Sequence, residues 1–141
     1  MTQLTQVEEF RKLAFDRIGA ILKSKGIENT LLRAQLSRDF IDVLSLLEEP
    51  SRTPLNDFAN DQISITQLRD GSYFWGGVFC DRLRKSQLTP QHFSGTLSLA
   101  YSQIPQLYGG LVDKTDDILE AFYRAHKSLD EPERGVIRLF N

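Results

Sequence analysis

The chain has 141 residues, of which 40% are hydrophobic and 26% are charged, and its formal net charge is −2 at pH 7. This length suits one ordinary domain over residues 1–141, and the composition argues against global disorder and against a strongly basic nucleic-acid-binding protein. We expect a soluble, cytoplasmic protein without a signal peptide, because the N-terminal residues are polar and no apolar run could cross a bilayer.

The first predicted helix begins at Thr5, because Thr5-Gln6-Val7-Glu8 has the form of a capping box. Gly26 suits the left-handed position that ends many helices, and Ile27 can then fold back on Leu22. Apolar side chains recur along this segment at helical spacing, and they predict one buried face: Val7, Phe10, Leu13, Ala14, Ile18, Ile21 and Leu22.

A short loop at 27–29 leads to a second predicted helix over 30–48, which Pro50 ends because the residue before a proline disfavours helical geometry. The shortness of the loop predicts an antiparallel hairpin of the first two helices. The predicted buried face of this second helix is Leu31, Leu32, Leu36, Phe40, Ile41, Val43, Leu44 and Leu47.

The aromatic stretch 73–80 holds the only tryptophan and the only cysteine, and we expect the core to form around it. Ser64-Ile65-Thr66-Gln67 has capping-box form, and the apolar positions after it follow helical spacing. The alternative for residues 63–80 is a β-hairpin that turns at Asp70-Gly71. We favour a helix, straight or bent at this turn, because the apolar run after it does not alternate.

The spacing places Trp75 in the core, on a stripe with Leu68 and Phe79. Gly76 and Gly77 follow at once, and each costs about 1 kcal/mol relative to alanine inside a helix. We therefore expect a close crossing with another helix at these two glycines, where no side chain stands between the backbones.

Three further helix starts are predicted downstream. Thr89-Pro90 has the form of an N-cap followed by a first-turn proline, and Pro105 should break or kink that helix. Asp113 or Thr115 should cap the next helix, whose early acidic and late basic residues match the helix dipole. Asp130-Glu131-Pro132-Glu133 predicts the last start. The predicted fold class is therefore all-α, a compact bundle of five or six helices in a single domain.

No catalytic residue, metal site or cofactor-binding motif is predicted. His92 and His126 lack partners at metal-ligand spacing, and we interpret both as surface or capping histidines. Cys80 is interpreted as an inert packing thiol, and as the only cysteine it excludes an internal disulfide and a cysteine-based zinc site. The absence of a catalytic constellation favours a binding or structural role, although enzymatic activity is left open.

Two segments are candidates for contacts with other molecules. Arg82, Arg84 and Lys85 form a basic cluster that could contact the phosphates of a nucleic acid, and further cations decorate the first helix: Arg11, Lys12, Lys23 and Lys25. Four apolar side chains near the C-terminus are a candidate protein interface, because they must be covered somewhere: Val136, Ile137, Leu139 and Phe140.

The first functional hypothesis is a non-enzymatic helical interaction module, a small subunit or adaptor of a larger intracellular assembly. Its partner would be another protein or a second copy of the chain, without membrane association. The second hypothesis is a helical subunit that contacts nucleic acid through the basic cluster. The third is a small ligand sensor with a pocket between helices, near Trp75 and Tyr108.

Overall fold

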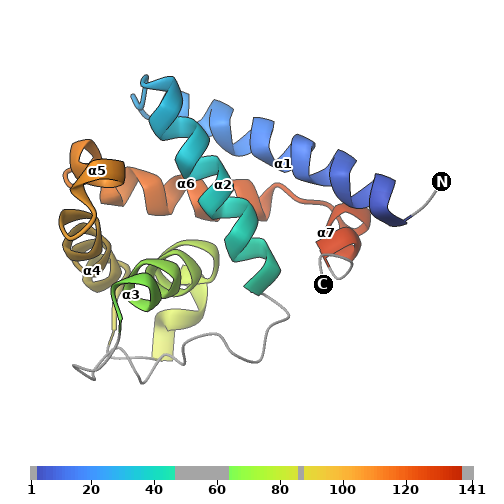
Figure 1. The fold of residues 1–141 in the computed structure, drawn as a ribbon. Helices are drawn as coiled ribbons and strands as arrows, with labels where there is room; N and C mark the ends of the chain where they lie inside the picture. The colour runs from blue at the N-terminus through green and yellow to red at the C-terminus, as the bar shows by residue number, and fades with distance from the viewer. Residues whose placement is uncertain (1–2, 47–63, 86–87, 138–141) are drawn as a thin grey trace.

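The computed structural model describes residues 3–46, 64–85 and 88–137. All regular structure in these ranges is helical, which confirms the all-α bundle, with seven α-helices where five or six were predicted (Figure 1). The helix that was not predicted is the short α5, which begins at Pro105, where the sequence predicts a break or kink. The elements are α1 (Gln3–Ser24), α2 (Thr30–Leu46), α3 (Ile65–Gly71), the π-helix η2 (Ser72–Val78), the 3-10 helix η3 (Cys80–Lys85), α4 (Pro90–Ser102), α5 (Pro105–Tyr108), the 3-10 helix η4 (Gly109–Leu111), α6 (Thr115–Lys127) and α7 (Glu131–Ile137).

Helix α6 lies at the centre of the bundle. It packs against α1 on one side and against α4 and η2 on the other, while α7 returns to pack on α1 (Figure 1). No described helix is long and apolar enough to cross a membrane. The largest fully buried side chains are aromatic, and they come from α2, η2, α4, α5 and α6: Phe40, Tyr73, Phe93, Tyr101, Tyr108 and Phe122.

Helix α1 ends as predicted but begins earlier. Gly26 has a φ of 88°, its amide donates to the carbonyl of Lys23 (3.0 Å), and the amide of Ile27 donates to the carbonyl of Leu22 (3.2 Å). This pair of bonds is the Schellman motif, with Ile27 buried after it. The predicted cap at Thr5 is wrong, because the helix continues back to Gln3 and Thr5 lies within it.

Helix α2 begins at the predicted residue, Thr30, where the side-chain oxygen of Asn29 accepts from the amide of Leu32 (3.1 Å). It packs against α1, as the predicted hairpin requires, and the predicted end near Pro50 lies outside the described residues. The prediction that Leu31 is buried is wrong, since it is 81% exposed. Helical spacing places it on the same face as Arg38, an exposed residue two turns later, rather than with Phe40.

The segment after Ser64 is helical, and the hairpin alternative is excluded. The predicted capping box is present: the Ser64 hydroxyl accepts from the Gln67 amide (3.2 Å), and the Gln67 side chain accepts from the Ser64 amide (3.0 Å). After Gly71 the helix widens into η2, a π-helix in which the Phe79 amide donates to the carbonyl of Phe74 (2.9 Å). π-Helical geometry is rare and is frequently associated with functional sites.

The wider turn of η2 changes which aromatic side chains face the core. Tyr73, Phe74 and Val78 are buried, whereas Trp75 is only partly buried. The prediction that Trp75 is fully buried in the core is therefore wrong. The prediction assumed regular α-helical spacing, which does not hold through the π-helical residues. Trp75 packs at the edge of the core, with its ring edge-on to that of Phe74 (4.9 Å between centroids).

The predicted close helix crossing at the paired glycines is confirmed. A Cβ atom on Gly76 would lie 2.4 Å from the Cβ of Phe93 in α4, and one on Gly77 would lie 3.2 Å from the Cβ of Phe122 in α6. Both glycines are buried. The missing side chains therefore let η2 approach α4 and α6 closely.

Helix α4 begins at the predicted Thr89-Pro90, where the Thr89 hydroxyl accepts from the His92 amide (3.2 Å), and it ends before Pro105. The predicted cap of α6 by Asp113 or Thr115 is wrong. Lys114 stands at the N-cap position, and Thr115 is instead buried with its hydroxyl 2.7 Å from that of Ser94 in α4. A tertiary hydrogen bond has thus taken the place of the local cap.

The predicted start at Asp130 is confirmed by reciprocal bonds. The Glu133 amide donates to Asp130 Oδ1 (2.8 Å), and the Asp130 amide donates to Glu133 Oε1 (2.9 Å). The Glu133 carboxylate also accepts two bonds from the guanidinium of Arg17 in α1, each 3.1 Å long. This paired contact ties α7 to α1 and lowers the pKa of Glu133.

Candidate functional site

The C-terminal interface candidates are divided by the structure. Ile137 is 4% exposed and belongs to the core of its own chain, and Val136 packs partly buried beside it. Leu139 and Phe140 lie outside the described residues. A partner could reach Ile137 only if α7 left α1, so this segment offers no ready-made docking surface within the described part of the chain.

The predicted basic cluster lies on η3, directly after the aromatic stretch. The backbone of Arg82, Arg84 and Lys85 is part of this 3-10 helix, but their side chains lie outside the described part of the structure. Of the cations predicted on the first helix, Lys25 is paired with Glu120 of α6 (2.5 Å). The contact of this cluster with nucleic acid therefore stays a prediction.

His92 is exposed, in agreement with its interpretation as a surface residue, but the same interpretation of His126 is wrong. His126 is 8% exposed and its ring stands edge-on to that of Phe79 (5.4 Å between centroids). Cys80 is half-buried, and burial raises the pKa of its thiol, which disfavours the reactive thiolate at neutral pH. No group of three potential metal ligands occurs among the described residues.

The most unusual chemical feature of the described structure is a buried group of a carboxylate and three tyrosine hydroxyls, which we call the tyrosine–aspartate network. Asp39 Oδ2 accepts from the hydroxyls of Tyr73 (2.9 Å) and Tyr108 (2.7 Å), and the Tyr73 and Tyr101 hydroxyls lie 2.6 Å apart. The three tyrosines are fully buried and Asp39 is 5% exposed. The network thus joins α2, η2, α4 and α5.

Burial dominates the electrostatics of this network. Desolvation raises the pKa of Asp39, although the hydrogen bonds from the two tyrosines and the charge of nearby Arg69 act in the opposite direction. Gln35 adds a third bond by donating to Asp39 Oδ1 (3.0 Å), and Arg69 donates to the Tyr108 hydroxyl (3.3 Å). Each oxygen of the carboxylate therefore has a protein donor, as a buried charge requires.

The tyrosine–aspartate network is a structural tie rather than a reaction centre. Its hydroxyls are out of reach of solvent, and other residues line the two cavities described below. The rings of Tyr101 and Tyr108 also stack in parallel, with centroids 4.4 Å apart and planes inclined by 6°. The network therefore fixes the position of α2 and of α5 relative to the rest of the bundle.

The first cavity is an open groove between α1 and α2, with a volume of about 420 Å³. The partly exposed side chains of Phe15 and Ile41 supply its apolar surface. We call it the α1–α2 groove, and the remaining residues that line it are charged: Arg11, Lys12, Arg38 and Asp42. Two cations that sequence analysis noted on the first helix, Arg11 and Lys12, are thus brought together with a third from α2.

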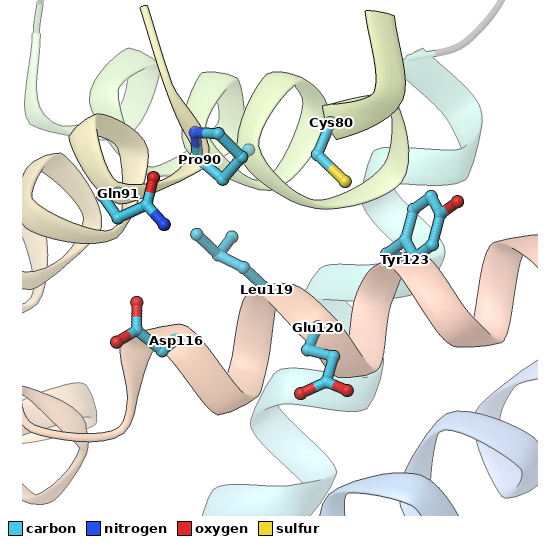
Figure 2. A pocket seen from close by; sticks show the side chains of 8 residues that line it. Cys80, Pro90, Gln91, Asp116, Leu119, Glu120 and Tyr123 are labelled. Atoms are coloured by element: carbon cyan, nitrogen blue, oxygen red, sulfur yellow. The ribbon is translucent and has the colours of Figure 1, made fainter. Parts of the chain in front are cut away.

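The second cavity lies between η2 and the helices α4 and α6, and its volume is about 180 Å³. In Figure 2, Gln91 and Asp116 lie on one side of Leu119, and Cys80 and Tyr123 lie on the other. We call it the α4–α6 cavity, and it is lined by Gly76, Cys80, Pro90, Gln91, Asp116, Leu119, Glu120 and Tyr123.

Sequence reasoning missed the network and both cavities. A local signal for the network existed, because Asp39 stands three residues after Leu36 and four before Val43, on the predicted apolar face of α2, where a charge is out of place. Three of the four tyrosines of the chain belong to the network, but their hydroxyls come together only through tertiary packing. The cavities combine residues from distant segments and had no local signal. Comparisons of the chain with protein-family models, with curated proteins and with solved structures found no match.

Proposed function

We propose that this protein is a non-enzymatic helical interaction module, a small subunit or adaptor that binds an acidic amphipathic segment of another protein in the α1–α2 groove. The observation that carries this proposal is the composition of the groove. Its apolar surface, Phe15 and Ile41, is flanked by three cations and a single carboxylate in a chain whose net charge is negative.

The apolar side chains supply the reason for a partner to bind. Phe15 and Ile41 are partly exposed on neighbouring helices, and covering them removes apolar surface from water. A groove between two helices accepts the apolar face of a third helix, whose anchors recur three or four residues apart. The fixed position of α2, which Asp39 holds through its buried network, keeps this groove in shape without a partner.

The charges supply the preference for an acidic partner. Arg11, Lys12 and Arg38 are exposed around the groove, and cations arranged in this way attract an acidic segment and set its orientation. Asp42 opposes them, and burial and the neighbouring carboxylate of Asp70 raise its pKa, but it is one carboxylate against three cations. An acidic segment therefore meets a net positive surface.

A fluorescence-anisotropy titration tests the proposal directly. The probe is a labelled, lactam-stapled helical peptide with leucines four residues apart and glutamates on either side of them, compared with the same peptide carrying lysines in place of the glutamates. We expect the acidic peptide to bind more tightly than the basic one, and its affinity to fall as salt is added. Equal binding of both peptides, or binding of neither, contradicts the proposal.

Two charge-reversal variants locate the binding. Arg38→Glu lies in the groove and should weaken binding of the acidic peptide by about tenfold, the factor expected for one well-placed charge contact. Lys23→Glu is the matched control, because Lys23 is an exposed cation of α1 that does not line the groove. A similar loss in both variants would mean that overall charge, not the groove, determines binding. Binding of a labelled RNA oligonucleotide that is abolished by Arg38→Glu would instead mean that the groove binds nucleic acid rather than an acidic protein segment.

A further inference from the structure

The α4–α6 cavity is separate from the α1–α2 groove and has a different chemical character. We propose that it is a binding site for a small organic cation, an ammonium group carried on a short apolar or aromatic body. This inference goes beyond partner binding, because it assigns a low-molecular-weight ligand to a second site on the opposite side of α6 from α1.

The size of the cavity sets the size of the ligand. A closed apolar cavity of about 150 Å³ is large enough to hold benzene. The α4–α6 cavity, at about 180 Å³ and partly open to solvent, is therefore suited to one aromatic ring with a short polar substituent. It lies against the π-helix η2 at Gly76, and such rare helical geometry recurs at functional sites.

The apolar part of the cavity suits the body of such a ligand. Leu119 lies at its centre, Pro90 is on the α4 side, and the ring of Tyr123 stands beside it, next to Cys80 (Figure 2). Aromatic rings pair favourably face to edge or offset, so the Tyr123 ring can contact an aromatic ligand. Cys80 adds a neutral polarizable side chain, because burial raises the pKa of its thiol.

The polar end of the cavity selects the charge of the ligand. Asp116 and Gln91 lie on the same side of Leu119, and an oxygen of Asp116 points toward the space below Gln91 (Figure 2). Glu120 is already neutralised by Lys25 of α1, and its carboxylate points away from Pro90 and Cys80. Among the described residues no ion pair involves Asp116. A ligand's ammonium group can therefore pair with Asp116, while an anion would meet a carboxylate that no described ion pair neutralises.

The ligand would thus place its ammonium group against the Asp116 carboxylate, on the Gln91 side of the cavity, and its body over Leu119 toward Tyr123. Hydrogen bonds to charged groups are stronger than neutral ones. The charged contact with Asp116 is therefore the main reason why a cationic ligand should bind more tightly than a neutral one. The apolar contacts contribute equally to the binding of a neutral ligand of the same shape.

The experiment is a titration of the 15N-labelled full chain followed by NMR, with benzylamine as the cationic probe, benzyl alcohol as the neutral one and benzoate as the anionic one. The three probes have nearly the same shape, so differences among them report charge. We expect benzylamine to shift the amide resonances of Gly76, Cys80 and Leu119, with a dissociation constant on the order of 1 mM for so small a molecule. Benzyl alcohol should bind about tenfold more weakly, and benzoate more weakly still.

Two variants complete the test. Asp116→Asn should weaken benzylamine binding by about tenfold and leave benzyl alcohol unaffected. Asp117→Asn is the matched control, because it removes the same charge from the same turn of α6 at a residue that does not line the cavity. Equal affinities of the unmodified protein for benzylamine and benzyl alcohol would overturn the proposal. Equal weakening by the two variants, or shifts confined to residues outside the cavity, would also overturn it.

Discussion

The close crossing of η2 with α4 at Gly76 predicts an unusual response to a very small substitution, Gly76→Ala. The added methyl carbon would stand 2.4 Å from the Cβ of Phe93, whereas two carbons in favourable contact lie about 3.5–4.0 Å apart. The two atoms must therefore separate by about 1 Å or more. Phe93 is fully buried, so its side chain has no open space into which it can move.

The magnitude follows from two opposing effects. Overpacking a well-packed core by extra carbon atoms costs about 1–3 kcal/mol, and the severity of this contact places Gly76→Ala near the upper limit. Replacement of a helical glycine by alanine recovers about 1 kcal/mol of backbone conformational entropy. The net expectation is a loss of about 2 kcal/mol in the free energy of unfolding.

Gly95→Ala is the matched control for this substitution. Gly95 lies in α4, is exposed, and has no atom within 4 Å of the position that its Cβ would occupy. It should therefore gain about 1 kcal/mol from helix propensity alone. Urea melts of the two variants and the unmodified protein measure both changes. A Gly76→Ala protein as stable as the unmodified chain would refute the close crossing of η2 with α4.

Three further predictions concern ionisable groups. Burial raises the folded-state pKa of Asp39, so ionisation of Asp39 opposes folding as pH rises. Urea melts at neutral pH and at about pH 5 should therefore show the unmodified protein gaining stability relative to Asp39→Asn at the lower pH, and an unchanged difference would contradict this. Arg17 lowers the pKa of Glu133, so the ion pair stabilises the fold only while Glu133 is ionised. The loss of stability caused by Arg17→Ala, measured by urea melts, should therefore shrink as pH falls to about 3, and a constant loss would argue against the ion pair. Burial raises the pKa of Cys80, so its alkylation by iodoacetamide, followed by mass spectrometry, should be slow at neutral pH and accelerate as pH rises. Rapid alkylation at neutral pH would show that the thiolate is not disfavoured.

Helix ends were predictable wherever the chain satisfied its own backbone groups. The Schellman motif at Gly26, the capping box at Ser64 and the N-cap at Thr89 are all made by residues within five positions of one another. Local bonds of this kind depend on the sequence alone, and they were identified correctly. The cap of α6 could not be predicted in this way, because the hydroxyl of Thr115 is bonded to Ser94, which is 21 positions away.

Amphipathic spacing determined most of the core, and it failed where the backbone left regular α-helical geometry. The glycine pair was correctly interpreted as a close crossing, because each glycine inside a helix costs stability relative to alanine and close packing is the usual reason for it. The partial burial of Trp75 could not be foreseen, since periodicity gives no sign that η2 is a π-helix. His126 was misjudged because its burial depends on Phe79, a residue of another element.

The candidate sites depended on tertiary structure almost entirely. The sequence by itself determined an all-α chain without a catalytic or metal-binding motif, and it identified Arg11 and Lys12 as exposed cations of the first helix. Only the packing of α2 on α1 brought Arg38 beside them, and only the packing of η2 on α4 and α6 created the cavity near Asp116. The physical reason is that helix caps and apolar periodicity are local properties of the chain, whereas a groove or cavity exists only between elements that are distant in sequence.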